Sequence, residues 1–455
     1  MHKRITTQRD IPSVTKVLDA LGAIDLPRPL IVDLVRRELS KVRTAKNIPE
    51  LESIVDLVRV SIATLRAGRV QPVINGTGIV IHTNFGRAPL APETIRAVSE
   101  TGAGYSNLEF DLTTGERGKR GIYVENAIAV LCGAESAAIV NNCAAALVLI
   151  VQHFTRAKPN VVISRGELVQ IGGGFRIGEI IEAAGAKLRE VGATNKTTLN
   201  DYARAIDRET AMILKVHRSN FFMSGFVESP SSAEIAALAR KKRIPFVEDL
   251  GSGAIVPSEQ LGIEEHEPTP ADALKNGADL VCFSGDKLFG GPQAGIIAGT
   301  RRFVAALRRE PLLRALRCDK LCLAALQSTV DLHLRQSIAE IPALALLQIS
   351  KDELRARAAA IFSRLRGLPL QISVGRGKAK VGGGTLPRSI MSSITIDIVP
   401  GHGSVADFAK VLRASNPPVI GYIGEGRFKL DLRTIFPQQD DLVVDAIRSA
   451  AATVP

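Results

Sequence analysis

The sequence predicts an α/β protein in which a mostly parallel, doubly wound large domain lies between an N-terminal helical domain and a small C-terminal α/β domain. Three observations predict this organisation. Amphipathic helical periodicity fills residues 1–66, and apolar runs of strand length alternate with helical stretches from about residue 100 to 310. From about residue 330 helices give way to short strands. We therefore expect domains at residues 1–66, 67–330 and 331–455.

Composition indicates a cytoplasmic globular protein with a polyanionic partner. The 455 residues carry a formal net charge of +12, which favours nucleic acid as that partner. Aromatic residues make up only 4% and Trp is absent, so contacts should go to phosphates rather than to stacked bases. Five cysteines without framework spacing indicate a reducing compartment, and Cys318 and Cys322 lack the further ligands of a metal site. Neither a membrane span nor an apolar signal core is evident.

The N-terminal domain is predicted to contain three helices. Ser13 caps the first helix, Gly22 ends it, and the third helix carries Leu51 near its start. The second helix begins at Pro29 and is amphipathic, with apolar residues on one face and basic residues on much of the rest. Its cations are Arg36, Arg37, Lys41, Arg43 and Lys46. This basic face suits RNA phosphates, and a solvated face of a packing or dimerisation module fits the spacing equally well.

Residues 70–90 break the helical pattern with three glycines and with the polar residues His82, Asn84 and Arg87. Polar groups between buried apolar residues need partners, which either a ligand or internal hydrogen bonds would supply. For His82 alone we favour internal hydrogen bonding.

Seven apolar runs are predicted to be strands of the large sheet. They are Ala137–Val140, Val161–Ser164, Leu188–Val191, Met212–Val216, Phe246–Val247, Leu280–Phe283 and Gly295–Ala298. Ligands collect at the carboxyl ends of such strands. Asn142, Cys143 and Ala144 follow the first run, where small residues let a helix N-terminus hold a cofactor phosphate. The alternative is an Asn that caps an Ala-rich helix.

The segment Phe283–Gly295, FSGDKLFGGPQAG, carries the lysine around which we predict the active site. Lys287 lies on a Gly-rich loop between two buried runs, where desolvation disfavours the charged ammonium, as a Schiff-base lysine requires. Lys287 therefore indicates an imine with pyridoxal 5′-phosphate (PLP), and Ser284 is close enough to contact the same phosphate. Asp249 ends an earlier strand and can pair with the pyridinium nitrogen of PLP. The alternatives are a surface lysine on a turn and an Asp that caps a loop.

Three further residues are candidates on weaker signals. His217 follows a predicted strand and could touch the cofactor, although a lone His at a strand end is more often a satisfied core residue. Arg314 and Arg317 lie three apart in a helix predicted over residues 311–320, so they would share one face that suits a phosphate-like anion. An exposed basic face is the alternative.

The small C-terminal domain is predicted to have helices, then a Gly- and Lys-containing loop over residues 375–384, then a hairpin. The hairpin pairs residues 418–423 with residues 427–432 through a turn at 424–426. Arg433 follows the last strand, and in many PLP enzymes an arginine from this domain holds the substrate carboxylate.

These motifs together resemble the bacterial selenocysteine synthase family, the L-seryl-tRNA(Sec) selenium transferases, over nearly the whole chain. The most specific segments are residues 74–91 (INGTGIVIHTNFGRAPLA), 105–120 (YSNLEFDLTTGERGKR), 164–177 (SRGELVQIGGGFRI), 248–253 (EDLGSG), 283–296 (FSGDKLFGGPQAGI) and 313–320 (LRALRCDK). The resemblance implies a fold-type-I, aspartate-aminotransferase-like PLP enzyme. It also implies an N-terminal domain that grips tRNA(Sec) and a ring-shaped homodecamer built from dimers.

The resemblance assigns roles to five residues already singled out. Lys287 is implied to be the PLP lysine and Asp249 its ring partner, while Arg87, Arg314 and Arg317 look like the set that binds selenophosphate. The implied reaction is a β-replacement, in which selenium takes the place of the seryl hydroxyl after Lys287 removes the α-proton. Serine esterified to tRNA has no free carboxylate, so the arginine after the last strand would need another role.

Four positions depart from the family pattern: His is usual at Tyr123, Asn at Cys143, Thr at Arg218 and Arg at Tyr422. None of these removes the lysine, its acid or the arginine set. Cys143 affects only side-chain contacts to the phosphate, since backbone N–H groups remain. Tyr123 is the more serious change if its position contacts the cofactor or the tRNA end.

Two other functions fit part of the pattern. A PLP-dependent lyase acting on a small phosphorylated amine, such as an amino-sugar phosphate, would use the three arginines as a phosphate clamp. That function leaves the helical N-terminal domain and the +12 charge unexplained. An RNA-binding or scaffold protein without chemistry conflicts with the intact Lys287 and Asp249. Absorbance from bound PLP separates the scaffold from the enzymes, and tRNA affinity separates the two enzymes.

Overall fold

The computed structural model describes residues 11–45, 48–171 and 174–453, so the predicted RNA contact Lys46 lies outside the described residues. The described residues fall into two compact units, one within Met1–Val73 together with Ala414–Pro418, the other within Ile74–Arg413 and Val419–Pro455. The second unit contains both the large and the small predicted domains. Helix α13 (Lys320–Leu334) runs through the boundary predicted at residue 330, so no linker separates the two there.

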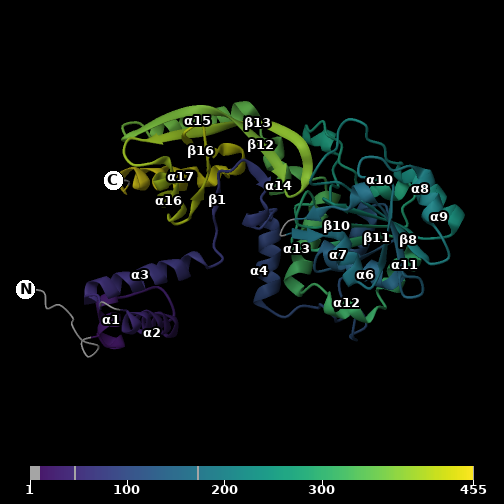
Figure 1. Ribbon diagram of the computed structural model, residues 1–455, viewed down its shortest axis with the longest axis horizontal. Coiled ribbons are helices and arrows are strands. Elements are labelled where there is room, and N and C mark those ends of the chain that lie inside the picture. The colour runs from purple at the N-terminus through teal and green to yellow at the C-terminus, as the bar shows by residue number, and fades with distance from the viewer. Residues whose placement is uncertain (1–10, 46–47, 172–173, 454–455) are drawn as a thin grey trace, which may run out of the picture. The chain divides into compact units, whose positions relative to one another are not determined.

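The described residues of the first unit form three helices, as predicted (Figure 1): α1 (Val14–Leu21), α2 (Arg28–Thr44) and α3 (Leu51–Ala67). The side-chain oxygen of Ser13 accepts a hydrogen bond from the backbone N–H of Lys16 at 3.2 Å and so caps α1. Gly22 ends α1 with φ at 71°, a conformation that glycine adopts without steric cost. The apolar faces of the three helices meet in one core, which leaves their polar faces to solvent.

The centre of the second unit is a seven-stranded sheet. In spatial order its strands are β3 (Ser136–Val140), β11 (Gly295–Gly299), β10 (Leu280–Ser284), β9 (Phe246–Gly251), β8 (Thr210–Val216), β4 (Asn160–Ser164) and β7 (Lys187–Val191). Each overlaps one of the seven apolar runs predicted as strands. Neighbouring strands pair in parallel except β11, which runs antiparallel to both β10 and β3. The predicted mostly parallel sheet is therefore confirmed.

Helices cover both faces of this sheet, because its buried strands are apolar on both sides. Along β10, Val281 and Phe283 belong to one apolar cluster, whereas Leu280 and Cys282 belong to another. The first cluster includes residues of α5 (Ile122–Leu131), α8 (Leu199–Ala205), α9 (Ser232–Lys242), α10 (Pro270–Lys275) and α13. The second includes residues of α6 (Cys143–Phe154), α7 (Ile177–Ala183) and α11 (Arg301–Leu307). Figure 1 labels these helices, except α5, around the sheet.

The C-terminal part of the second unit forms a five-stranded sheet. In spatial order its strands are β15 (Tyr422–Gly424), β16 (Arg427–Asp431), β13 (Thr385–Pro400), β12 (Leu370–Gly382) and β2 (Ile79–Ile81). Helices α15 (Lys351–Arg364), α16 (Val405–Arg413) and α17 (Asp440–Thr453) share an apolar cluster with this sheet. A separate parallel pair joins β1 (Ile74–Asn75) to β14 (Val419–Ile420).

One prediction for this region is wrong and another, the hairpin turned at residues 424–426, is confirmed only in part. Residues 375–382 belong to β12 rather than to a loop, because exposed basic residues alternate there with buried small or apolar ones, which is the period of a strand. In the predicted hairpin, only Tyr422–Gly424 pairs with β16. Val419 and Ile420 instead pair with β1, a partner far away in the sequence that local turn signals do not reveal.

The remaining elements are α4 (Pro92–Ala103), α12 (Pro311–Ala315), α14 (Pro342–Gln348) and a short antiparallel pair, β5 (Gln170–Ile171) and β6 (Phe175–Arg176). Within residues 11–45, 48–171 and 174–453, no helix combines the length and apolarity needed to cross a bilayer.

Candidate active site

The loop that follows β10 holds Lys287 in a buried position. Lys287 is only 7% exposed. Backbone hydrogen bonds fix the loop on both sides, from Leu288 N to Ser252 O at 3.0 Å and from Gly285 N to Ala294 O at 2.8 Å. In the described part of the chain the Lys287 ammonium has no hydrogen-bond or ion-pair partner. A buried amine on a rigid loop is thus available to react.

Asp249 lies next to this lysine because β9 and β10 are parallel neighbours. Asp249 is the register partner of Cys282 and is only 7% exposed. Burial raises the pKa of Asp249, while the positive charge of Lys287 and the Cys143 thiol favour its ionised form. A Cβ atom at Gly251, two residues after Asp249, would lie 3.9 Å from the Lys287 amine. The acid and the amine therefore share one buried site at the carboxyl ends of two strands.

The start of α6 lies at the same site. Asn142 is its N-cap, and its side-chain oxygen accepts a hydrogen bond from Ala145 N at 2.8 Å. The Cys143 thiol donates a hydrogen bond to Oδ1 of Asp249 at 3.5 Å. Among the described residues, the backbone N–H groups of Cys143 and Ala144 have no hydrogen-bond acceptor. Free N–H groups at a helix N-terminus bind anions, so the predicted phosphate site and the predicted ring site adjoin.

His217 and Ser284 lie at the strand ends that border this site. The backbone N–H of His217 donates to Asp249 O at 2.8 Å, whereas its ring Nε2 lies 3.3 Å from Oε1 of Glu267. The imidazole thus has an internal acidic neighbour, which was the alternative that the sequence left open. Ser284 is the buried last residue of β10.

Arg87 is joined to the residue before the lysine. Its Nη1 lies 2.8 Å from Oδ2 of Asp286, and the backbone N–H of Ala88 donates to Asp286 O at 3.1 Å. The second carboxylate oxygen of Asp286 is buried and has no hydrogen-bond partner among the described residues. Sequence reasoning missed the role of Asp286 in holding Arg87, although an acid directly before the lysine was a visible signal.

The helix predicted over residues 311–320 is wrong. α12 ends at Ala315, and α13 begins at Lys320 because the Asp319 carboxylate accepts hydrogen bonds from two backbone N–H groups of its first turn. Arg317 lies between the helices and does not share a helix face with Arg314, although its Nε donates to Arg314 O at 3.3 Å. Backbone pairing of Leu316 O with Asn141 N at 2.9 Å brings this segment to the start of α6.

A carboxylate that sequence reasoning missed lies beside Arg317. Oε1 of Glu109 is 3.2 Å from Nη1 of Arg317 and 2.8 Å from Nη2 of Arg120, and its Oε2 is 2.8 Å from Nη2 of Arg117. Three arginines around one partly exposed acid leave a net positive charge there. The structure therefore joins Arg317 to Glu109 and Arg87 to Asp286, while Arg314 is exposed on α12.

Comparisons with known proteins identify the family. The family model described as SelA, L-seryl-tRNA selenium transferase, matches residues 73–436. L-seryl-tRNA(Sec) selenium transferase of Carboxydothermus hydrogenoformans is 44% identical over 446 residues, which cover 95% of each chain. That of Aquifex aeolicus is 41% identical over 434 residues, covering 94% of this chain and 95% of the relative. The chain belongs to the L-seryl-tRNA selenium transferase family.

A solved structure is similar in fold to this member of the L-seryl-tRNA selenium transferase family. D-Glucosaminate-6-phosphate ammonia-lyase superposes with a TM-score of 0.57 at 21% identity, covering 84% of this chain and 96% of that one. The predicted fold class, a fold-type-I PLP-dependent transferase, is confirmed, and so is PLP as the cofactor. The family membership also confirms that the chain is an enzyme rather than a scaffold protein.

The residues of this family member fit PLP. The buried Asp249 carboxylate needs a cationic partner, which the ring nitrogen of PLP supplies when protonated. The free N–H groups at the start of α6 suit its phosphate. Lys287 lies next to both groups. The individual roles of these residues stay predictions, since they follow from geometry and chemistry alone.

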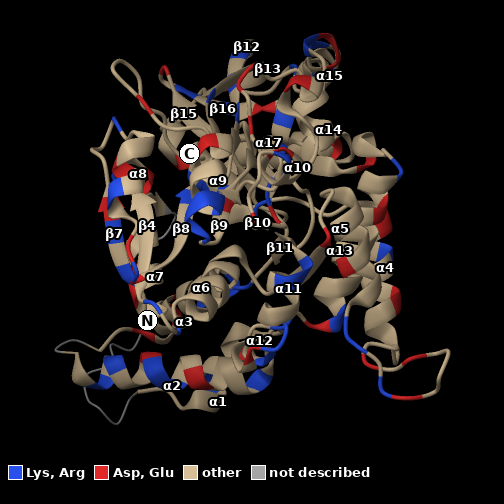
Figure 2. Cartoon of the chain, turned by 90° about the vertical axis from the view of Figure 1, so that its right-hand side faces the viewer, with Lys and Arg blue, Asp and Glu red and all other residues tan. Residues whose placement is uncertain are grey.

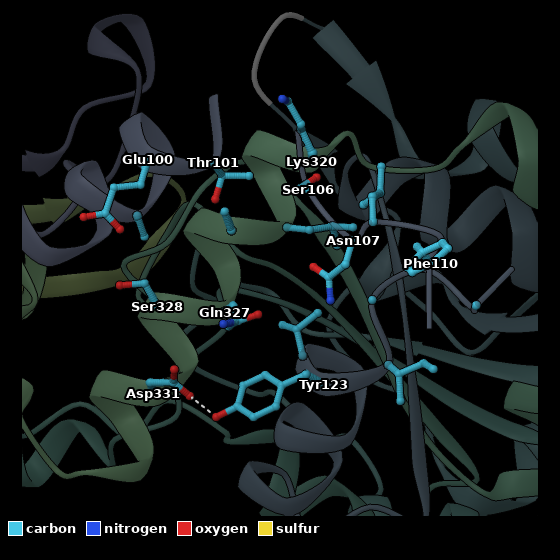
Figure 3. A pocket seen from close by; sticks show the side chains of 18 of the residues that line it. Glu100, Thr101, Ser106, Asn107, Phe110, Tyr123, Lys320, Gln327, Ser328 and Asp331 are labelled. Carbon is cyan, nitrogen blue, oxygen red and sulfur yellow. Dashed lines mark hydrogen bonds between the residues drawn. The ribbon is translucent and has the colours of Figure 1, made fainter. Parts of the chain in front are cut away.

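Tyr123, where the chain departs from the family pattern, lies in a cavity of about 830 Å³ between α4, α5 and α13. Figure 3 shows its hydroxyl donating to Oδ1 of Asp331, a hydrogen bond of 2.7 Å that raises the pKa of Tyr123. None of Lys287, Asp249 and Cys143 lines this cavity. The Tyr123 departure therefore concerns this cavity rather than the predicted PLP site.

The predicted RNA contacts lie on α2, where Figure 2 shows Lys and Arg alternating with acidic residues. We call Arg36, Arg37, Lys41 and Arg43 the α2 basic residues; all four are exposed. Nη2 of Arg37 lies 2.6 Å from Oδ2 of Asp33, and Nζ of Lys41 lies 2.7 Å from Oε1 of Glu38. The Arg37–Asp33 pair is exposed on both sides and contributes little to stability, so Arg37 can exchange partners, whereas Lys41 is exposed but its partner Glu38 is buried.

Arg433 follows β16 and is buried, although it also lines a second cavity of about 830 Å³. Its Nη1 donates to the backbone oxygens of Leu346 and Leu347 at 3.0 and 3.1 Å, and its Nη2 donates to Ser392 O at 2.9 Å. These bonds engage Nη1 and Nη2 with main-chain carbonyls, whereas the buried Nε has no hydrogen-bond partner among the described residues. Arg433 therefore positions the segments around it.

Proposed function

We propose that this chain replaces the hydroxyl of seryl-tRNA(Sec) with selenium and uses selenophosphate as the selenium donor. The observation that carries the proposal is the buried pair of Asp249 and Lys287 at the ends of β9 and β10, in a chain of this family. A buried acid beside a reactive amine supplies the two side-chain contacts that a PLP enzyme needs for the ring nitrogen and the aldehyde carbon.

Four kinds of group would hold the cofactor. The Lys287 amine would bond to its aldehyde carbon, and the Asp249 carboxylate would pair with its ring nitrogen. The backbone N–H groups at Asn142–Ala144 and the Ser284 hydroxyl would bind its phosphate. When bound, PLP supplies an electron sink that makes the α-proton of the seryl group acidic. The low dielectric around Asp249 strengthens its attraction for a protonated ring nitrogen.

Lys287 and Asp286 would carry out different tasks on the loop after β10. The Lys287 amine is placed to accept and to return the proton at the substrate α-carbon, and the hydrogen-bonded loop keeps it in position. The Asp286 carboxylate would orient Arg87 toward the donor. We propose that Arg87, Arg314 and Arg317 bind selenophosphate, since guanidinium groups form strong hydrogen bonds with phosphate-like anions.

Because Arg317 contacts Glu109, selenophosphate would have to compete with this carboxylate for the Arg317 guanidinium. An incoming selenophosphate has to draw Arg317 away from this carboxylate. Because both side chains are about one-third exposed, the ion pair is weak and can be exchanged. Arg117 and Arg120 would keep Glu109 neutralised after the exchange.

The α2 basic residues would contact the phosphates of tRNA(Sec), which the net charge of +12 supports. We also propose a homo-oligomer built from dimers, with a decamer as the expected assembly, acting in the cytoplasm. Exposed apolar side chains support a contact between subunits, because Leu112, which lines the cavity between α4, α5 and α13, and Val130 of α5 are both exposed.

The test is a transfer reaction with purified full-length protein, seryl-tRNA(Sec) and selenophosphate. The aminoacyl group is released by mild base and identified by mass spectrometry. We expect selenocysteine with wild type and serine with Lys287→Ala, while seryl-tRNA(Ser) should remain unchanged. Unreacted serine in every sample, together with ammonia release from an amino-sugar phosphate, would favour the lyase instead.

A further inference from the structure

Two thiols and a carboxylate from three separate elements converge beneath the start of α6. Cys143 comes from α6, Asp249 from β9 and Cys282 from β10, and their ligand atoms all lie within 4.8 Å of one another. We call these three residues the thiol–carboxylate cluster. Sequence patterns do not reveal this cluster, because Cys143 and Cys282 lie far apart along the chain. It departs from the expectation that the protein holds no metal.

The spacing of the cluster matches the ligand spacing of a zinc site. Zinc–sulfur and zinc–oxygen bonds of about 2.3 and 2.1 Å at a tetrahedral angle place sulfur and oxygen about 3.6 Å apart. The distance from the Cys143 sulfur to Oδ1 of Asp249 is 3.5 Å. Two zinc-bound sulfurs lie about 3.8 Å apart, and the Cys143 and Cys282 sulfurs lie within 4.8 Å. A shift of under about 1 Å would complete the set.

We propose that the cofactor-free protein binds one Zn²⁺ ion at Cys143, Asp249 and Cys282, with a water molecule as the fourth ligand. Two thiolates and a carboxylate carry three negative charges, so the bound ion leaves a net charge of −1. The ammonium of Lys287, which acts electrostatically on Asp249, neutralises this charge. The site as a whole is therefore neutral, as a buried site requires.

Burial and access both suit a thiol-binding metal. Asp249 and Cys282 are buried, which protects their bonds from water, whereas Cys143 is partly exposed and gives the ion a route inward. Zinc binds cysteine as the thiolate, so each thiol gives up its proton when it binds the ion. Binding therefore releases protons as the thiolate–metal bonds form.

Zinc and PLP would compete for the same atoms. Asp249 is the residue proposed to pair with the ring nitrogen, and Cys143 is the first residue of the helix proposed to hold the phosphate. When zinc or PLP is bound, Asp249 and the start of α6 are no longer available to the other. The reaction proposed above uses no metal, so zinc at this position is an inhibitor that the bound cofactor excludes.

The experiment titrates full-length, PLP-free, reduced protein with Cd²⁺, a spectroscopic probe for zinc sites. Cadmium–thiolate bonds absorb in the near ultraviolet, so we expect one saturable equivalent, which Zn²⁺ displaces. Cys143→Ser and Cys282→Ser should each weaken binding by about tenfold or more, because an alcohol replaces a thiolate ligand. Cys322→Ser, which changes a thiol outside the cluster, should bind like wild type. Protein saturated with PLP should bind no cadmium at this site.

Three results would overturn the inference: no saturable binding by wild type, equal binding by both cluster variants, or undiminished binding by the PLP-saturated protein. Because Cys143 is partly exposed, Cys143→Ser keeps the test decisive even if Cys282→Ser fails to fold. The cadmium titration itself needs neither PLP nor tRNA. Metal binding without selenium transfer would therefore refute only the proposed function, and transfer without metal binding would refute only the zinc site.

Discussion

Replacing Gly295 with Ala tests whether the start of α6 and the lysine loop form one rigid site. Gly295 is the first residue of β11, and an added Cβ would lie 2.0 Å from the backbone oxygen of Asn142. Real Cβ contacts stay above 3.0 Å, so α6 or β11 must move by about 1 Å. Such overpacking costs about 1–3 kcal/mol of folding free energy. A misplacement of about 1 Å at an active site lowers the rate by up to about 100-fold.

Two assays separate these effects. Urea unfolding measures the loss of stability, and a PLP titration followed by absorbance measures cofactor affinity. Gly104→Ala is the matched control, since Gly104 has φ of −143° and no atom within 4 Å of its added Cβ. We expect Gly295→Ala to bind PLP more weakly than the control and to transfer selenium more slowly. Wild-type stability and PLP affinity in Gly295→Ala would refute the close approach on which this reasoning depends.

Four further outcomes are expected. Borohydride should fix PLP covalently to wild type but not to Lys287→Ala, which should fold normally by circular dichroism; labelling of another lysine would refute the assignment. Replacing both Arg314 and Arg317 with Ala should spare PLP absorbance and abolish most transfer from selenophosphate, so unchanged transfer would exclude them from the donor site. Changing the α2 basic residues to Ala should weaken tRNA binding and reduce its salt slope by about one per lost phosphate contact, measured by filter binding from low to high salt. Burial raises the pKa of Glu125 to about 7 despite Arg308, so the folded state loses stability as pH rises from about 4.5 to about 7. Glu125→Gln should therefore unfold at higher urea than wild type at pH 8 and at the same urea at pH 5.

The sheet and the central acid–lysine pair could be predicted because both follow from local pattern. Strands that are buried on two faces appear as apolar runs, and the carboxyl ends of neighbouring parallel strands necessarily adjoin. Lys287 and Asp249 follow from these two rules together.

The missed features depend on contacts between distant segments. The pair of Arg87 with Asp286 spans 199 residues, and that of Arg317 with Glu109 spans 208. The periodic pattern of apolar residues in a sequence does not reveal ion pairs between such distant residues. The break between α12 and α13 was missed for a different reason, because Asp319 was not recognised as the cap that starts a new helix. The convergence of Cys143 on Cys282 likewise appears only once α6 is placed above the sheet.

The strand pairings of residues 74–81 determine the order in which parts of the protein can fold during synthesis. Ile74 pairs with Val419 and Ile79 pairs with Lys380, so the first strands of the second unit wait for partners roughly 300 residues later. A ribosome adding about 5–20 residues per second needs about 15–60 s to make them. During that time Ile74, whose native apolar neighbours begin at Ile349, has no native cover, and it is a candidate for chaperone binding. The seven-stranded sheet, which ends at Gly299, can form earlier, whereas the second unit closes only after its last strands leave the ribosome.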